Sequence, residues 1–201
     1  MAQPNTGRKW TTALLSRIGI LGAIASVLYV FPEIPIIPPM YKLDFSTIPA
    51  LLAGYSMGSI PGLLVLLIKD LVGLTHSSSL GVGELADFLM SGVFVVAASL
   101  IYQKNRSFKG ALTGMLIGTA FMGIVGALVN YFIIIPFYIS AFKMSSDAII
   151  GMVAMTIPAV DSLWKLILLA TLPFNLLKGL ALCLIAVLIY KRLSPLLHVR
   201  K

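Results

Sequence analysis

The stretch Pro173-Phe174-Asn175-Leu176-Leu177-Lys178-Gly179 opens an apolar run that ends at Lys191-Arg192. Proline suits the first turn of a helix, because the N–H that it lacks is not needed there. Residues 173–190 therefore predict a helix of membrane-spanning length. Asn175 and Lys178 share one face of this helix. A lysine beside hydrocarbon is costly, so we interpret Lys178 as a functional residue that points at a partner; the alternative is a lysine that snorkels to the interface.

The composition predicts an integral membrane protein. Of the 201 residues, 59% are hydrophobic and only 11% are charged, which is not typical of a soluble domain. The single cysteine, Cys183, excludes an internal disulfide framework and is interpreted as packing. The basic excess could indicate nucleic acid as a partner, but its distribution along the chain indicates membrane topology instead.

Apolar runs separated by polar or proline-rich segments predict six transmembrane helices, and so an all-α integral membrane bundle. The runs cover residues 12–31, 48–57, 60–74, 84–102, 108–138 and 173–190. The second and third are short for a full span, so we expect them to be tilted or buried by neighbours. Residues 144–172 are left open, with short helices at the membrane surface as one possibility. We expect a basic N-terminal arm at 1–11, the membrane domain at 12–192 and a basic tail at 193–201.

The charges predict the orientation. Ten of the 15 basic residues lie in the N-terminal segment, the loop after the fourth helix and the tail: Arg8, Lys9, Arg17, Lys104, Arg106, Lys109, Lys191, Arg192, Arg200 and Lys201. All seven acidic residues fall toward the other side of the membrane. The positive-inside rule therefore places both termini in the cytoplasm.

The polar residues of the membrane domain gather toward the outer side. They come from five helices or their loops: Asp44, Lys69, Asp70, Glu84, Asp87, Asn130, Asn175 and Lys178. This pattern predicts a polar pocket that opens outward above an apolar floor. A channel or an alternating-access transporter needs polar residues on both sides of the midplane. Because the chain also lacks an ATP-binding loop, we predict that it captures a solute without driving its transport.

Small residues on the first helix form rows at a spacing of four. They are Gly19, Gly22, Ala23 and Ser26. Such rows let another helix approach closely, which predicts a surface for docking a partner. The alternative is packing within the same bundle.

Short motifs along nearly the whole chain resemble one family, the riboflavin-specific S components of energy-coupling-factor (ECF) transporters. They are, in order, Pro38-Pro39, Leu43-Asp44-Phe45-Ser46 with Pro49, Lys69-Asp70, Glu84-Leu-Ala-Asp87-Phe88-Leu with Gly92, Asn130-Tyr131-Phe132 with Pro136-Phe137-Tyr138, and Pro173-Phe174-Asn175 with Lys178-Gly179. No single motif decides the matter, and the specificity lies in their combination and order.

The resemblance implies a multi-pass subunit of the cell membrane that binds riboflavin from outside. It also implies docking on a transmembrane coupling subunit with two ATP-binding cassette ATPases, and passage of the vitamin as the S component topples. Asn130, Asn175 and Lys178 match family positions that hold the flavin ring. The family docks through an alanine pair on its first helix, where this chain has other small residues. Asp70 stands where the family has asparagine.

The chemistry of a flavin fits the predicted pocket. Its pyrimidine edge presents C=O, N–H and C=O in a row, which asparagine amides can pair with and a lysine can donate to. Aromatic side chains offer flat apolar area for the ring, and carboxylates suit the ribityl hydroxyls. The predicted ligand-binding set is Tyr41, Leu43, Asp44, Phe45, Lys69, Glu84, Asp87, Phe88, Asn130, Tyr131, Phe174, Asn175 and Lys178. Riboflavin is here a transported ligand, and no cofactor is expected.

Three alternatives remain at this point. An S component for another water-soluble vitamin would have the same fold, although a cationic vitamin such as thiamine would disfavour Lys178. An integral membrane enzyme could use Lys178 with Glu84 for acid/base work. However, the sequence has no metal-ligand cluster and no nucleophile-elbow motif, so we do not expect an enzyme. A purely structural subunit would leave the buried lysine and asparagines as an unexplained cost.

Overall fold

The structure is a computed structural model that describes residues 10–31, 34–37 and 41–197, with side chains up to residue 189. Most of the predicted arm, the end of the predicted tail and Pro38-Pro39 lie outside the described residues. The elements are α1 (Thr12–Val30), β1 (Ile34–Ile37), β2 (Tyr41–Leu43), α2 (Thr47–Met57), α3 (Ser59–Gly73), α4 (Val82–Lys104), α5 (Phe108–Val129), α6 (Ile135–Ala141), α7 (Ser146–Ala154), α8 (Leu163–Leu166) and α9 (Leu172–Leu197).

The prediction of a helical membrane protein is confirmed. Within the described residues, five helical stretches are long and apolar enough to cross a membrane: Thr12–Val30, Ser59–His76, Val82–Lys104, Phe108–Ala141 and Leu163–Ile189. They correspond to five of the six predicted helices. The second predicted helix, α2, forms with 11 residues, which is less than the usual membrane-spanning length.

Hydroxyl side chains fix where several helices begin. Thr11, Ser107, Ser145 and Ser162 each precede a helix in an extended conformation. Each side-chain oxygen accepts a hydrogen bond from the backbone N–H three residues later. These N-caps satisfy donors that the first helical turn would otherwise leave unpaired.

The continuous helical stretch that contains α9 begins ten residues before the predicted start at Pro173. Helical structure starts at Leu163 and passes through a π-helical turn, Ile167–Thr171, before the proline. A second π-helical turn, Asn130–Ile134, precedes Pro136 in the same way. A proline offers no N–H to the preceding turn and clashes with its carbonyl, and a wider turn accommodates both effects. The prediction was wrong because it took the proline as a helix start.

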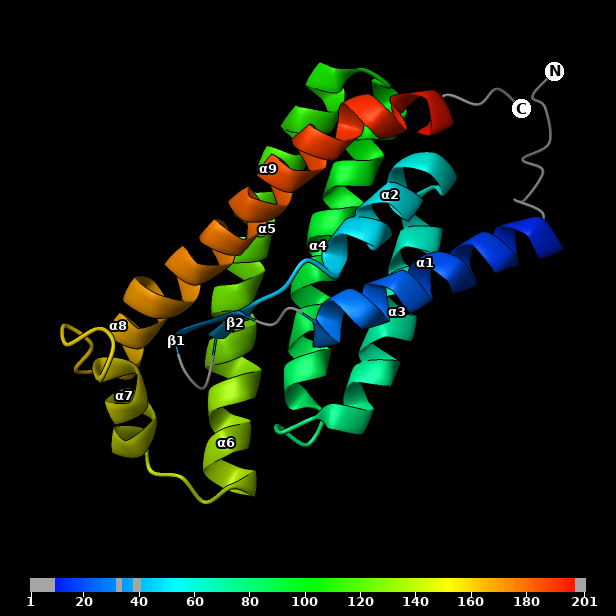
Figure 1. Cartoon of the computed structure of the whole chain (residues 1–201). Helices are drawn as coiled ribbons and strands as arrows, with labels where there is room; N and C mark the ends of the chain where they lie inside the picture. Colours follow the sequence, from blue (N-terminus) through cyan, green and yellow to red (C-terminus); the bar gives the residue numbers. More distant parts are fainter. Residues whose placement is uncertain (1–9, 32–33, 38–40, 198–201) are drawn as a thin grey trace, which may run out of the picture.

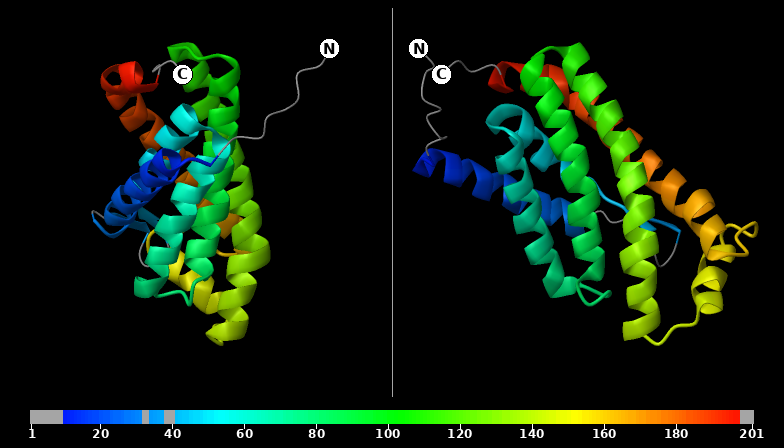
Figure 2. Two further views of the ribbon diagram at one scale, coloured as in Figure 1. Left: turned by 90° about the vertical axis from the view of Figure 1, so that its right-hand side faces the viewer. Right: turned by 180° about the vertical axis from the view of Figure 1, so that it is seen from behind.

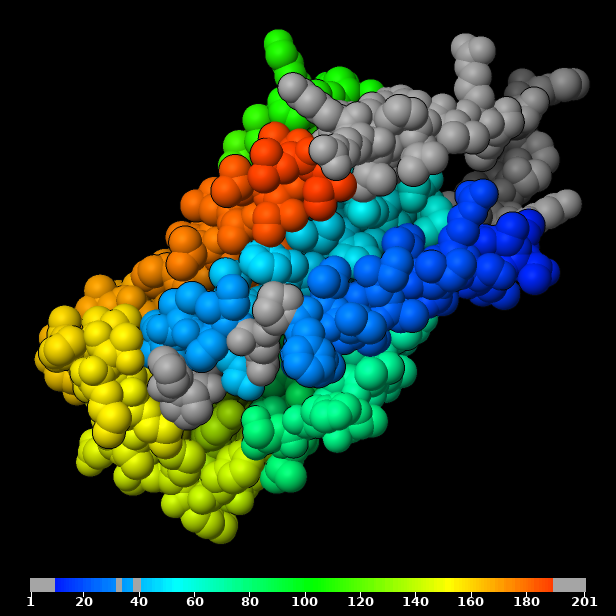
Figure 3. Space-filling model, viewed as in Figure 1, coloured from blue at the N-terminus to red at the C-terminus, as the bar shows by residue number. Residues whose placement is uncertain are grey.

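The β1–β2 hairpin is a correction to the all-helical prediction. Its strands pair antiparallel, with Ile34 opposite Leu43. Isoleucine-rich sequence favours extended backbone, and the prolines of this segment disfavour a helix. The hairpin packs with α7, α8 and the first part of α9 in an apolar cluster that includes Ile37, Tyr41 and Phe174. It lies on the surface between α1 and the α7–α8 segment (Figure 3).

The helices form a bundle with two distinct ends. The α4–α5 turn and the end of α9 lie at one end, and the α3–α4 and α6–α7 connections lie at the other (Figure 1). Glycines allow α4 and α5 to approach closely: a Cβ added at Gly114 would lie 2.7 Å from the carbonyl oxygen of Ala98. α1 crosses the bundle obliquely (Figures 1 and 2). The segment 144–172, left open by the sequence, forms α7, a turn, α8 and a π-helical turn.

Candidate ligand-binding site

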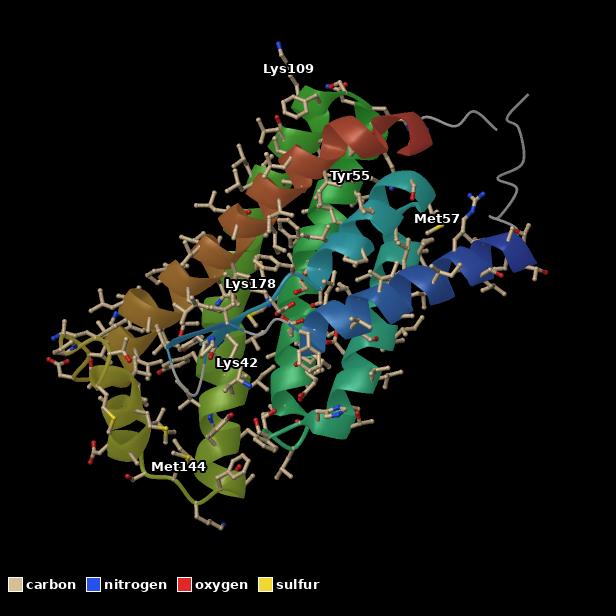
Figure 4. The ribbon with its side chains drawn as sticks, in the orientation of Figure 1. Lys42, Tyr55, Met57, Lys109, Met144 and Lys178 are labelled. Carbon is tan, nitrogen blue, oxygen red and sulfur yellow. The ribbon has the colours of Figure 1, made fainter. Side chains whose placement is uncertain are left out.

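A cavity of about 230 Å³ lies where the end of α1, the hairpin, the α3–α4 connection, α4, the α5–α6 junction and α9 meet. Its lining residues are Tyr29, Val30, Tyr41, Lys42, Asp44, Gly73, His76, Ser78, Ser79, Gly83, Glu84, Ala86, Asp87, Met90, Asn130, Ile134, Tyr138, Phe174, Asn175 and Lys178. Figure 4 shows Lys178 near the centre of the molecule, where α9 passes the hairpin.

The cavity brings together eight of the thirteen residues predicted to bind a ligand. They are Tyr41, Asp44, Glu84, Asp87, Asn130, Phe174, Asn175 and Lys178. They come from β2 and the chain after it, from α4, from the start of the π-helical turn Asn130–Ile134 and from α9. Residues far apart in the sequence therefore meet in one place, as the polar pattern predicts.

The other five predicted residues lie outside the cavity lining. Leu43 is half-buried in β2, and Phe45 packs against the main apolar core. Phe88 lines a separate groove on the outside of the bundle. Tyr131 is 41% exposed on the surface. Lys69 is fully buried and pairs with Asp87, which lines the cavity.

Five buried charges form a continuous network beneath the cavity. Lys178 Nζ donates to Asp44 Oδ2 at 2.9 Å and to Asp87 Oδ1 at 2.8 Å. Lys69 Nζ pairs with the other oxygen of Asp87 and lies 2.7 Å from Asp70 Oδ1. Each of these five residues is less than one-tenth exposed. Three carboxylates thus share two ammonium groups, and Asp87 joins the two lysines.

Neighbouring groups hold the network in position. The backbone N–H of Ser46 donates to Asp44 Oδ1 at 2.9 Å, and its hydroxyl contacts the same oxygen. Lys69 Nζ lies 4.6 Å from the centroid of the Tyr29 ring, within cation–π range. These contacts orient the carboxylate that receives Lys178, and they supply further partners that buried charges require.

Two polar side chains beside the cavity have hydrogen-bonding capacity that the described residues do not use. Asn130 Nδ2 donates to the carbonyl of Gly126 at 2.9 Å, and Asn175 Nδ2 donates to the carbonyl of Thr171 at 2.9 Å. Asn175 Oδ1 is buried and has no hydrogen-bond partner among the described residues. The ammonium of Lys178 has three donors, and the two carboxylates use two of them. An amide oxygen without a partner and an ammonium with one unused donor therefore sit on adjacent turns of α9, beside the cavity.

Gly126 makes room for Asn175. A Cβ at this position would lie 2.6 Å from Asn175 Nδ2, which is too close for any real contact. The same glycine accepts the hydrogen bond from Asn130. Sequence reasoning did not single out Gly126, because many glycines occur in this helix and only the fold shows which one faces an asparagine.

An aromatic wall closes one side of the cavity. The rings of Tyr41 and Phe174 lie 5.1 Å apart between centroids, at 45°. The hydroxyls of Tyr41 and Thr171 are hydrogen-bonded at 2.5 Å. Burial raises the pKa of Tyr41 to about 12, against a smaller lowering by the bond to Thr171, so its hydroxyl stays neutral at physiological pH. This wall offers apolar area beside the polar groups of α9.

Beside the predicted Glu84, the cavity is lined by several residues that the sequence did not indicate as ligands. Glu84 accepts hydrogen bonds from Ser77 at 2.8 Å and from Ser79 at 3.2 Å. His76, Ser78 and Lys42 also line this region. The polar loop after α3 was visible in the sequence, but nothing in its pattern placed it over the pocket.

The four small residues of α1 divide between two surfaces. Gly22 is buried, with Ile68 so close that a Cβ would lie 2.8 Å from its Cγ2 atom. Ser26 is also buried and donates to the carbonyl of Gly22 at 2.9 Å. Gly19 and Ala23 are exposed, and nothing lies within 4 Å of a Cβ built at Gly19. One row therefore packs inside the bundle, and the other faces outward.

Comparisons with known proteins agree with this arrangement. The chain is 35% identical over 184 residues to the riboflavin transporter RibU of Staphylococcus aureus (strain TCH60), covering 91% of each chain. It is 32% identical over 184 residues to the riboflavin transporter FmnP of Bacillus subtilis (strain 168), covering 89% of this chain and 90% of the relative.

A solved structure of the S component of a bacterial ECF transporter has the same fold. It superposes with a TM-score of 0.72 at 34% identity, covering 92% of this chain and 98% of the other. The family model described as the substrate-specific component of ECF transporters matches residues 14–190. The chain therefore belongs to the family of substrate-specific components of ECF transporters.

Proposed function

We propose that this protein binds riboflavin in the cavity between the hairpin, α4 and α9 and delivers it to an ECF transporter. The observation that carries the proposal is the convergence of Asn130, Asn175 and Lys178 on one cavity beside the aromatic wall. The relatives named as riboflavin transporters support the same ligand.

The geometry suits the two halves of a flavin. The amides and the third donor of Lys178 match the alternating acceptors and donor of the pyrimidine edge. Tyr41 and Phe174 supply apolar area for the ring. Glu84, at the serine-rich mouth, suits the hydroxyls of a ribityl chain. We propose the eight cavity residues as the binding set, with Lys69 positioning Asp87 from outside it.

Isothermal titration of the detergent-purified protein tests the ligand. Riboflavin should bind to the parent protein, and thiamine should not, because a cation would meet the Lys178 ammonium. Asn175→Leu keeps the size of the side chain and removes the amide. We expect a loss of about 1–3 kcal/mol, or roughly 5- to 150-fold in Kd.

Asn105→Leu is the matched control, since Asn105 is exposed at the end of α4 and far along the helix from the cavity. Its Kd should equal that of the parent protein. Equal riboflavin affinities for Asn175→Leu and Asn105→Leu, or tight binding of thiamine, would refute the proposed ligand or site.

We further propose that α2 counts as the sixth helix of the membrane domain and that both termini lie in the cytoplasm. The α4–α5 turn, with Lys104 and Lys109, lies at the same end of the bundle as the end of α9 (Figures 1 and 4). The positive-inside rule then places this end in the cytoplasm and the cavity toward the outside. The protein would thus capture the vitamin from outside and is not an enzyme.

The proposed partners are a transmembrane coupling subunit and two ATP-binding cassette ATPases, as in ECF transporters generally. The outward row of Gly19 and Ala23 on α1 is the proposed docking surface, because small residues let a partner helix approach. Gly22 and Ser26 face the interior and would contribute by setting the position of α1 rather than by contact.

A further inference from the structure

A second hollow lies on the outside of the bundle, along α4 between α3 and α5. It has a volume of about 540 Å³. The view from behind in Figure 2 looks onto these three helices. All its lining residues are apolar: Leu63, Phe88, Leu89, Gly92, Val93, Val96, Ala97, Leu100, Ile101, Ile117 and Phe121. We call this surface the α4 groove; it shares no residue with the ligand cavity.

Side-chain size explains why the groove exists. Its floor on α4 includes Gly92 and Ala97, which leave space that larger residues would fill. Leu63 of α3 forms one wall, and Ile117 and Phe121 of α5 form the other. Ile117 is 40% exposed and Phe121 is 49% exposed, so this wall faces the outside of the bundle rather than its interior. A groove of this kind in a membrane domain must be covered by something apolar.

The length of the groove favours a lipid chain over a partner helix. From Phe88 to Ile101 it runs about 20 Å along α4, at about 1.5 Å per residue. The hydrocarbon core of a bilayer is about 30 Å thick, so one leaflet contributes about 15 Å. The groove is thus about two-thirds as long as the hydrocarbon span that a transmembrane helix of a partner would cross.

Both sides of the groove lead to a lysine at the same end. On α4, Lys104 follows Leu100 by four residues and therefore lies on the same helix face. On α5, Lys109 lies eight residues before Ile117, about two turns nearer the α4–α5 turn. Both lysines are exposed, and Lys109 extends from the α4–α5 end of the bundle (Figure 4). The groove therefore points toward the end of the bundle that carries these two exposed lysines.

We propose that the α4 groove is a binding site for an anionic phospholipid. One acyl chain lies along α4, and the phosphate of the headgroup lies between Lys104 and Lys109. Lysines next to a membrane attract anionic lipids, while the groove selects for an extended apolar chain. The proposal does not depend on which vitamin the cavity binds.

Native mass spectrometry of the detergent-purified protein tests the proposal, with phosphatidylglycerol and phosphatidylcholine of identical acyl chains as the probes. The parent protein should prefer phosphatidylglycerol. The double variant Lys104→Gln/Lys109→Gln should weaken phosphatidylglycerol binding about 30-fold and abolish the preference. Ala97→Phe fills the groove and should weaken the binding of both lipids. Lys143→Gln and Ala141→Phe, which change an exposed lysine and an exposed alanine away from the groove, should leave binding unchanged.

Two outcomes would overturn the proposal. One is an unchanged preference for phosphatidylglycerol in the double glutamine variant, whose surface changes leave the fold intact. The other is unchanged lipid binding by Ala97→Phe, at a parent-like unfolding temperature, combined with failure to assemble with the coupling subunit. The second outcome would identify the groove as a protein interface instead.

Discussion

Replacing Lys178 with methionine removes the cation on which two buried carboxylates depend. Methionine keeps most of the length of the side chain, so the packing changes little. The ammonium lies 2.9 Å from Asp44 and 2.8 Å from Asp87, and all three groups are buried. Removing one partner from such a pair costs about 3–5 kcal/mol, because the remaining charge has no compensation. We expect Lys178→Met to lower the free energy of unfolding by that amount.

The same change should weaken riboflavin binding. The ligand loses a charge-assisted donor worth about 1.5–3 kcal/mol, which corresponds to roughly 10- to 150-fold in Kd. Lys104→Met is the matched control, because Lys104 is exposed and far from the cavity along α4. Unfolding in mixed micelles without ligand gives the stability, and isothermal titration gives the affinity.

A double-mutant cycle separates the network from the ligand contact. Asp44→Asn neutralises the carboxylate that Lys178→Met leaves without a cation, since Asp87 keeps its pairing with Lys69. The sum of the stability losses of the two single variants should therefore exceed the loss of the double variant by about 0.5–3 kcal/mol. Additive stability losses would show that Lys178 does not hold Asp44. A Lys178→Met variant that binds riboflavin as tightly as Lys104→Met would show that the lysine does not contact the ligand.

Three further predictions follow from other parts of the structure. Gly126→Ala should displace Asn175 and weaken riboflavin binding about tenfold without removing any ligand-contacting atom, while Gly151→Ala, in open space on α7, should bind as the parent does; equal Kd values would contradict this. Ala23→Trp should preserve riboflavin binding but block ATP-driven uptake in the reconstituted transporter, and normal uptake would exclude this docking surface. In a background without the native cysteine, Lys143→Cys should react with an impermeant thiol reagent in intact cells and Lys109→Cys should not; the reverse would invert the orientation.

Much of the site was predictable because the membrane makes polar residues conspicuous. Lys178, Asn130 and Asn175 stand out in apolar runs, and helix periodicity places two of them on one face. Their convergence in one cavity agrees with the prediction that they serve a common pocket. What the sequence lacked was the identity of their partners, since the pairing of Lys178 with Asp44 and Asp87 depends on how distant segments pack.

The remaining differences have specific physical causes. Pro173 looked like a helix start, but the π-helical turn before it lets the helix continue from Leu163. The rows on α1 looked equivalent in sequence, yet only Gly22 packs against Ile68, because the rotation of a helix about its axis is fixed by its neighbours. Tyr131 looked like a ring-stacking residue next to Asn130, but adjacent helical residues point in different directions.

The distribution of the buried charges along the chain bears on how the protein assembles in the bilayer. To the network, the residues up to the end of α4 supply three carboxyl groups, Asp44, Asp70 and Asp87, but only the one ammonium of Lys69. Lys178 arrives later in the chain, on a helix whose insertion it disfavours by about 2.5–3.5 kcal/mol. Each half is thus electrically incomplete in lipid. Joining them pairs the cation of the late helix with carboxylates of the early ones, so the last helix gains its counter-ions only by packing against the earlier part of the chain.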